Sequence, residues 1–215
     1  MPRRRPSRPP RRPRRRAACV RRSWRCRARI RSAWTALWPA GTGPGSAGGL
    51  SFEAVTELPA GGDPGASLDA EDRAAIADLL YAYAWHLDRN EPEEVGEVFS
   101  EDASLDYGPE VPTIVGRRRI VEAVALGQKE IFAGCSHHIS NVRISPDGDG
   151  EAAVTAYVYS WTSYRSGAPD GDMWGQYHCR MRRTADGWRI AEMVLRVAGM
   201  KNFHRGSMHP IGRRP

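Results

Sequence analysis

Two side chains with complementary acid–base chemistry lie far apart in the sequence. Asp88 closes the apolar stretch Leu79–Asp88, and His137 belongs to the polar stretch Ser136–Asn141. An imidazole titrates near neutral pH and can take a proton from a substrate, while a carboxylate beside it can orient the ring and stabilise its protonated form. If the fold brings the two together, they are a candidate acid–base pair.

Asp88 falls at the end of a predicted amphipathic helix, on the flank that it shares with Ala77, Tyr81 and Ala84. The small neighbours leave room for a ligand beside the carboxylate. A carboxylate near a helix C-terminus meets the unfavourable end of the helix dipole, so it favours a partner. The alternative interpretation is a solvated acid at a helix end.

His137 and His138 are neighbours on a predicted strand, so their side chains point to opposite faces of the sheet. The apolar residues do not choose between them, because Ile139 shares a face with His137 whereas Val142 and Ile144 share one with His138. Either histidine can be a purely structural residue of the sheet.

The predicted strands carry many aromatic residues, and those that face the helices would wall an apolar pocket suited to a ring-bearing ligand. We therefore count Trp161, His178 and His138 among the candidate ligand contacts, with core or interface positions as the alternative for most aromatic residues. His204 and His209 fall in a polar tail, where we expect them to be solvated.

No cofactor is indicated by the motifs of the chain. The sequence contains no phosphate-binding loop, dinucleotide fingerprint, nucleophilic-serine motif or metal-spaced set of His, Asp and Glu. The four cysteines (Cys19, Cys26, Cys135 and Cys179) show no C-x-x-C spacing, which favours reduced thiols over disulfides or a zinc site. We therefore expect a site that works without cofactor or metal.

Helices are predicted in the first part of the folded chain and strands in the second. A helix from an N-cap at Asp69 to Asp88 is followed by a short helix near Val95, a short strand at 103–108 and a third helix after Gly116. Segments rich in Val, Ile, Tyr, Trp and Thr then predict four strands, at 136–145, 152–165, 173–184 and 187–197. This order indicates an α+β fold with helices on one face of a curved, mostly antiparallel sheet.

The positive charge of the chain is concentrated at its start. Residues 1–50 hold 15 Arg and no Lys, Asp or Glu, which leaves 17 basic against 25 acidic groups in residues 51–215. We interpret residues 1–50 in three ways. They can be a disordered arm that binds nucleic acid or anionic lipid, an Arg-rich targeting segment, or a stretch that the natural product lacks because translation starts downstream.

We expect residues 51–66 to be a linker, residues 67–199 to form the folded domain, and residues 200–215 to be a polar, poorly ordered C-terminal tail. No apolar run approaches the length of about 20 residues that spans a bilayer, so we expect a cytoplasmic protein without membrane contact. Nucleic acid would be a partner only through the Arg-rich segment.

Five short pieces of the sequence, in this order, resemble the SnoaL-like group of the nuclear transport factor 2-like fold. The group includes scytalone dehydratase, bile-acid 7α-dehydratase and hexachlorocyclohexane dehydrochlorinase. The matching pieces are Ile76–Asp88, Val98–Ala103, Val115–Arg117, His137 to Ile144 and Asp186–Ile190. The resemblance covers roughly residues 68–198 and implies a cone-shaped α+β barrel with three N-terminal helices packed on the sheet.

The resemblance also implies roles for single residues. Asp88 and His137 correspond to the Asp–His dyad of the group, and the spacing to Asn141 selects His137 over His138. Tyr83 and Tyr107 match positions where members carry functional tyrosines. The match is incomplete where Trp161 replaces a second pocket histidine of scytalone dehydratase, and at three further positions: Leu87, Cys179 and Met181.

These observations lead to two functional hypotheses. The first is a cofactor-independent lyase or isomerase, similar to a dehydratase, that acts on a small apolar cyclic molecule through Asp88 and His137. The second is a non-catalytic ligand-binding or assembly subunit similar to the β subunits of ring-hydroxylating dioxygenases. Cones of this kind leave the outer face of the sheet apolar, so a homodimer or homotrimer is expected in either case.

Overall fold

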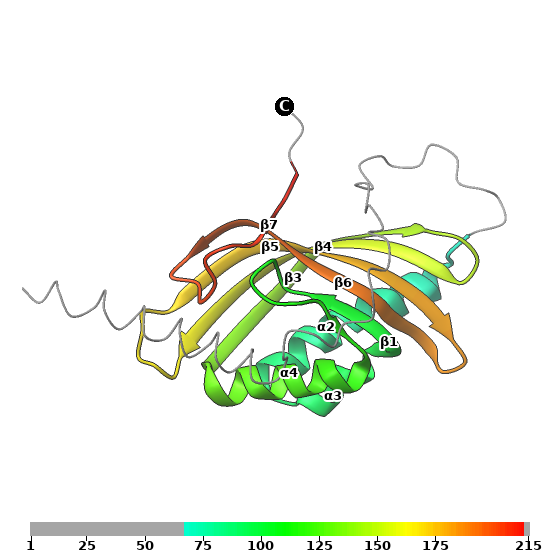
Figure 1. Cartoon of the computed structure of the whole chain (residues 1–215). Coiled ribbons are helices and arrows are strands. Elements are labelled where there is room, and N and C mark those ends of the chain that lie inside the picture. Colours follow the sequence, from blue (N-terminus) through cyan, green and yellow to red (C-terminus); the bar gives the residue numbers. More distant parts are fainter. Residues whose placement is uncertain (1–66, 213–215) are drawn as a thin grey trace, which may run out of the picture.

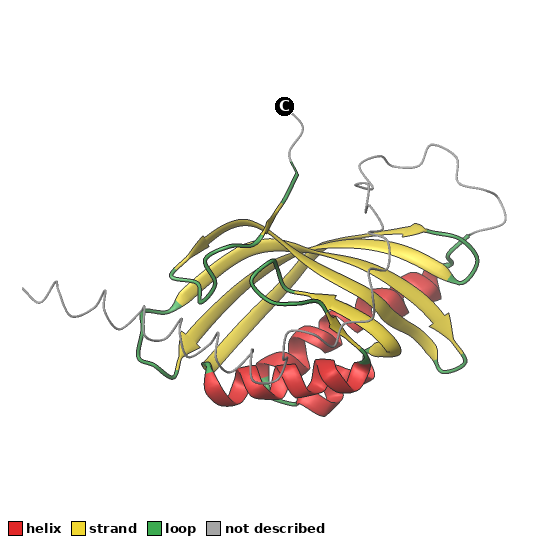
Figure 2. Cartoon of the chain, viewed as in Figure 1, coloured by secondary structure: helices red, strands yellow, loops and turns green. Residues whose placement is uncertain are grey.

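The computed structural model describes residues 67–212, and the predictions for residues 1–66 lie outside this range. Three helices lie against the concave side of one strongly curved sheet (Figures 1 and 2). The helices are α2 (Ala70–Asp88), α3 (Pro92–Glu97) and α4 (Arg117–Glu130). The predicted α+β fold, with helices on one face of a curved sheet, is therefore confirmed.

Four long strands form most of the sheet, and three shorter strands complete it. The strands are β1 (Phe99–Asp106), β2 (Ile114–Val115), β3 (Phe132–Pro146), β4 (Glu151–Tyr164), β5 (Gly171–Thr184), β6 (Gly187–Lys201) and β7 (His209–Pro210). Their order is β2-β1-β6-β5-β4-β3, with β7 paired to β6. All pairs are antiparallel except β1 with β6 and β6 with β7, so the sheet is mostly antiparallel and stays open.

Helix α2 begins and ends where the sequence predicts. The side chain of Asp69 accepts a hydrogen bond from the backbone N–H of Asp72 at 2.8 Å, which caps the first turn. The Asp72 carboxylate accepts a hydrogen bond from the indole N–H of Trp188 at 3.0 Å and pairs with Arg183. These contacts fix the start of α2 on the sheet, so its last residue, Asp88, has a defined position.

The core lies between α2 and the concave face of the sheet. On α2 the buried residues follow the helical period, and on β4 every second residue is buried. A strand alternates its side chains between two faces, so the intervening residues of β4 lie on the convex face. The inward residues at the start of β4 are Ala152, Val154, Ala156 and Val158, whereas Tyr157 is 47% exposed on the convex face.

A β-bulge at Asn141 changes the side-chain alternation of β3. The pairing with β4 shifts between Ser140 and Arg143, and Asn141 adopts a left-handed backbone with φ of 50°. One extra residue in a strand moves every following side chain to the opposite face. His137 and Ile139 before the bulge therefore share the concave face with Val142 and Ile144 after it.

The C-terminal segment is folded against the sheet up to residue 212, so our expectation of a poorly ordered tail from residue 200 is wrong. The strand β7 pairs with β6, and the carboxylate of Asp106 accepts a hydrogen bond from His209 Nε2 at 3.0 Å. Glu110 accepts hydrogen bonds from the backbone N–H groups of Gly206 and Ser207, at 3.0 and 2.8 Å. Within residues 67–212, no helix is long and apolar enough to cross a membrane.

Candidate active site

Asp88 and His137 meet where the end of α2 packs on β3. The Nδ1 atom of His137 lies 2.6 Å from Oδ1 of Asp88, and the backbone N–H of His137 donates to Oδ2 at 2.7 Å. The side chain of His137 is 11% exposed and that of Asp88 is 24% exposed. The carboxylate thus holds both the ring and the main chain of the histidine.

This geometry defines the state of both groups. Burial raises the pKa of Asp88, but the two hydrogen bonds from His137 and its Coulombic attraction outweigh this effect and lower the pKa below its usual 3.8. Asp88 is therefore ionised at neutral pH and accepts the proton of Nδ1. In the neutral imidazole the other ring nitrogen, Nε2, then carries a lone pair and can act as a base.

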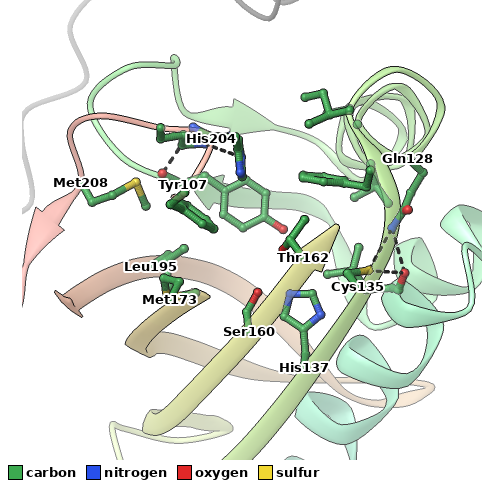
Figure 3. Close-up of a pocket in the computed structure, with 18 of the residues that line it drawn as sticks. Tyr107, Gln128, Cys135, His137, Ser160, Thr162, Met173, Leu195, His204 and Met208 are labelled. Carbon is green, nitrogen blue, oxygen red and sulfur yellow. Dashed lines mark hydrogen bonds between the residues drawn. The ribbon is translucent and has the colours of Figure 1, made fainter. Parts of the chain in front are cut away.

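His137 lines a partly open cavity of about 90 Å³ between the helices, the sheet and the C-terminal segment (Figure 3). In the same measure one water needs about 10–15 Å³, so the cavity holds the equivalent of several waters, about the size of a small ring compound. Apolar groups dominate its lining, including Leu87, Ala123, Val124, Ile131, Phe132, Met173 and Leu195. His137, at 11% exposed, is therefore largely surrounded by apolar groups.

Tyr107 and Tyr83 form a pair of which only Tyr107 reaches the cavity. Their hydroxyl groups are hydrogen-bonded to each other, and the ring of Tyr83 packs edge-on against Phe99 and Tyr177 in the core. Burial raises the pKa of Tyr107 and raises that of Tyr83 well above the ordinary value, the latter with repulsion from Tyr107 and Tyr177. Both phenols therefore keep their protons and remain hydrogen-bond donors.

Polar residues that the sequence reasoning did not assign to the site surround the dyad. Gln128 of α4 donates from Nε2 to the carbonyl of Leu87 at 2.8 Å, and the thiol of Cys135 lies 3.6 Å from the same oxygen. Burial raises the pKa of Cys135 from its usual 9.0 to about 11, so the thiol is neutral. Gln128 could have been recognised as a site candidate from the sequence, because it is a polar residue on the buried face of α4.

Ser160 and Thr162 are two further cavity residues that the sequence reasoning missed. Each is 3% exposed, and both continue the inward-facing row of β4. Ser160 is the register partner of His137 (Figure 3). Their positions could have been predicted from the sequence, because the two hydroxyl groups interrupt the apolar row on the buried face of β4.

A metal would have to compete with these hydrogen bonds. Donor atoms of Asp88, Cys135 and His137 lie within 4.8 Å of one another. However, both oxygens of Asp88 already accept hydrogen bonds from His137, and the thiol of Cys135 carries its proton at neutral pH. The arrangement therefore fits a proton-transfer pair better than a metal-ligand set.

Three residues predicted to contact a ligand lie on the convex face instead. The His138 ring packs near Tyr159, with 5.7 Å between ring centroids, and Trp161 is an outward residue of β4. His178 is an outward residue of β5 and pairs with Gln176 at 3.1 Å. Side chains alternate between the two faces of a strand, and each of these three residues is next in sequence to one that lines the cavity. The prediction that they contact a ligand there is therefore wrong in all three cases.

The C-terminal segment closes one side of the cavity through residues that we expected to be outside the domain. Phe203, His204, Arg205 and Met208 all line it. The ring of His204 contacts the rings of Phe132, Tyr164 and Phe203, so the expectation of a solvated His204 is wrong. The short polar sequence of this segment has no periodicity from which its position could have been predicted.

The comparisons with known proteins agree with this architecture. A family model described as a SnoaL-like domain matches residues 69–194. The comparison with curated proteins gives no significant match. The resemblance inferred from the five sequence pieces is confirmed by the family match.

Solved structures with the same fold include two from Novosphingobium aromaticivorans. One, provisionally named a scytalone dehydratase, is 31% identical with a TM-score of 0.63, and the match covers 67% of this chain and 96% of that one. The other, provisionally named an aromatic ring hydroxylase, is 26% identical with a TM-score of 0.58, covering 63% and 95%. A hexachlorocyclohexane dehydrochlorinase, 14% identical with a TM-score of 0.57 and coverage of 67% and 94%, shares the fold alone.

Proposed function

The chain belongs to the SnoaL-like family of the nuclear transport factor 2-like fold, and from this premise we propose that it is a cofactor-independent lyase or isomerase for a small apolar cyclic molecule. The observation that carries the proposal is the 2.6 Å contact between His137 Nδ1 and Asp88 Oδ1 in the wall of a mostly apolar cavity. The structure provisionally named a scytalone dehydratase supports a dehydratase-type reaction.

The proposed reaction starts with proton transfer to His137. Its Nε2 takes a proton from a carbon next to a carbonyl group, and the electron pair of that C–H bond forms the double bond of an enolate. Asp88 stabilises the imidazolium that results. Expulsion of a hydroxyl group from the next carbon, with the proton returned by His137, gives an enone and water; return of the proton to another carbon gives an isomer.

Tyr107 would stabilise the enolate oxygen. Its neutral hydroxyl lines the cavity and donates a hydrogen bond to the developing charge, which is most effective where water is excluded. Tyr83 would act behind it as a positioning residue, because its hydroxyl meets that of Tyr107.

The test uses a reaction that needs only the base. A bicyclic ketone such as 2-tetralone is incubated with the protein in D₂O, and NMR follows the incorporation of deuterium next to the carbonyl. Asp88→Asn and His137→Gln should each lower the catalysed exchange by about 10²–10⁴-fold. Asp78→Asn is the matched control, because Asp78 is an exposed carboxylate of the same helix.

Thermal melts of the variants should show that the fold is retained. Exchange that survives in both Asp88→Asn and His137→Gln would exclude the dyad from the chemistry. The same assay run on a panel of cyclic hydroxyketones, read as the ultraviolet absorbance of the enone product, then searches for dehydration itself.

A second candidate function is a non-catalytic assembly subunit. Two observations favour it: large side chains on the convex face are exposed, with Tyr157 at 47% and Trp174 at 48%, and one similar structure is provisionally named an aromatic ring hydroxylase. Light scattering, the exchange assay and the identity of any co-purifying chain would together distinguish the two candidates. A stand-alone homo-oligomer with exchange activity favours the enzyme, and co-purification with a larger oxygenase chain favours the subunit.

A further inference from the structure

The cavity has polar groups on two sides, and the mechanism above uses only one of them. His137, Cys135 and Ser160 lie on one side of Tyr107, while His204 and Met208 lie on the other (Figure 3). Arg205, next to His204, also lines the cavity and is 8% exposed. The second polar side is therefore built entirely from the C-terminal segment.

His204 presents a hydrogen-bond donor without an acceptor. Burial lowers the pKa of His204 to about 3, with a further contribution from the charge of Arg205, so the ring is neutral. The Nε of Arg205 donates to Nε2 of His204 at 3.4 Å, and a guanidinium can only donate. The proton of the neutral ring therefore sits on Nδ1, which is buried and has no hydrogen-bond partner among residues 67–212.

Arg205 adds a positive charge beside this donor. Burial lowers its pKa, but arginine remains charged in proteins, and attraction from the carboxylates of Glu110 and Asp106 opposes the shift. The guanidinium lies over the ring of Tyr107, at 5.6 Å from its centroid, and Nη1 donates to the Tyr107 carbonyl at 3.4 Å. A cation fixed in an apolar wall attracts an anion strongly because little water screens it.

We propose that His204 and Arg205 bind a carboxylate carried by the ring compound that occupies the cavity. This inference rests on the proposed function, because it assigns the ligand of the same cavity. One guanidinium and one neutral N–H suit a single negative charge, and the planar fork of arginine matches the two oxygens of a carboxylate. The apolar lining between the two sides accommodates the ring, so the carboxylate anchors the ligand while its other end faces His137.

The experiment compares two probes of nearly equal shape, 2-naphthoate and its neutral amide, by isothermal titration calorimetry at neutral pH. The protein should bind the carboxylate about tenfold or more tightly than the amide, the range expected of a charge-assisted hydrogen bond. Arg205→Gln should remove this preference while changing the affinity for the amide by less than about twofold. Lys201→Gln, which removes an exposed charge at the start of the segment, is the control and should retain the preference.

The other outcomes decide against the proposal. Two results would mean that Arg205 only holds the C-terminal segment in place. One is equal affinity of the unmodified protein for the two probes, and the other is an equal loss of affinity for both probes in Arg205→Gln. His204→Phe keeps the aromatic packing but lacks the N–H donor, and unchanged affinity for both probes would remove His204 from the site. Asp88→Asn should keep the preference for the carboxylate even without turnover, so failure of the dyad and failure of the anion site are separate results.

Discussion

One carboxylate holds His137 at two points: Oδ1 of Asp88 lies 2.6 Å from the ring nitrogen Nδ1, and Oδ2 lies 2.7 Å from the backbone N–H of the same histidine. The first contact sets the tautomer of the ring, and the second ties β3 to the end of α2. Asp88 therefore contributes to stability as well as to the proposed chemistry, and the two contributions can be measured separately.

The contribution of Asp88 to stability should depend on pH. Burial raises its pKa, but the hydrogen bonds from His137 and the attraction of its ring outweigh this, so the pKa lies below 3.8. A carboxyl group with a lowered pKa in the folded state stabilises it above the unfolded pKa, and this stabilisation is lost as the pH falls through the folded pKa. The difference in free energy of unfolding between the unmodified protein and Asp88→Asn should therefore be largest near neutral pH and shrink below about pH 4.

Urea denaturation of the two proteins across this pH range measures that difference, because titrating groups that do not contact Asp88 cancel in the comparison. Asp78→Asn, which changes an exposed carboxylate of the same helix, should differ from the unmodified protein by about zero in free energy of unfolding at every pH. A difference in free energy of unfolding for Asp88→Asn that stays constant into the acidic range would contradict the lowered pKa of Asp88.

The two tyrosines should differ in their effect on catalysis. Tyr107→Phe removes the hydroxyl that lines the cavity and should lower the exchange rate by about 10²–10³-fold, as loss of an oxyanion donor does. Tyr83→Phe removes only the partner that orients this hydroxyl, so the loss should be on the order of tenfold. The rate constants at saturating ketone check this order, and a larger effect of Tyr83→Phe would reverse the assigned roles.

Cys135 should react slowly in the folded protein. Burial raises its pKa to about 11, which reduces the reactive thiolate about 100-fold relative to an ordinary thiol at the same pH. Iodoacetamide labelling at neutral pH, followed by peptide mass mapping, should show slow modification of Cys135 in the native protein and fast modification in urea. Rapid labelling of the native protein would mean that this thiol is a thiolate or lies open to solvent.

The bulge at Asn141 should depend on the residue type there. Its backbone φ of 50° lies in the left-handed region, which costs a β-branched residue about 1–2 kcal/mol. Asn141→Val should therefore lower the free energy of unfolding by about this amount, whereas Asn141→Gly, which adopts the same conformation readily, should change it little. Chemical denaturation of both variants provides the measurement, and equal stability of the two would mean that β3 can pair without the bulge.

Much of the architecture could be predicted because it depends on local sequence. The N-cap at Asp69 and the apolar stripe of α2 are short-range patterns, and the structure places both as expected. Strands β3, β5 and β6 are longer than predicted, whereas β4 has its predicted length. Strands β2 and β7 were missed because each has only two residues. Asp88 and His137 were chosen as a pair because of the resemblance to a family. The contact between them is consistent with that choice.

The faces of the strands and the closure of the cavity were decided only by the tertiary structure. The bulge at Asn141 resolves the ambiguity between His137 and His138, because a single extra residue exchanges the two faces of a strand. The same period of two puts Ser160 in the cavity and Trp161 outside it. His204 and Arg205 reach the cavity through contacts with Asp106, Tyr107 and Glu110 about a hundred positions earlier, and no local pattern encodes such contacts.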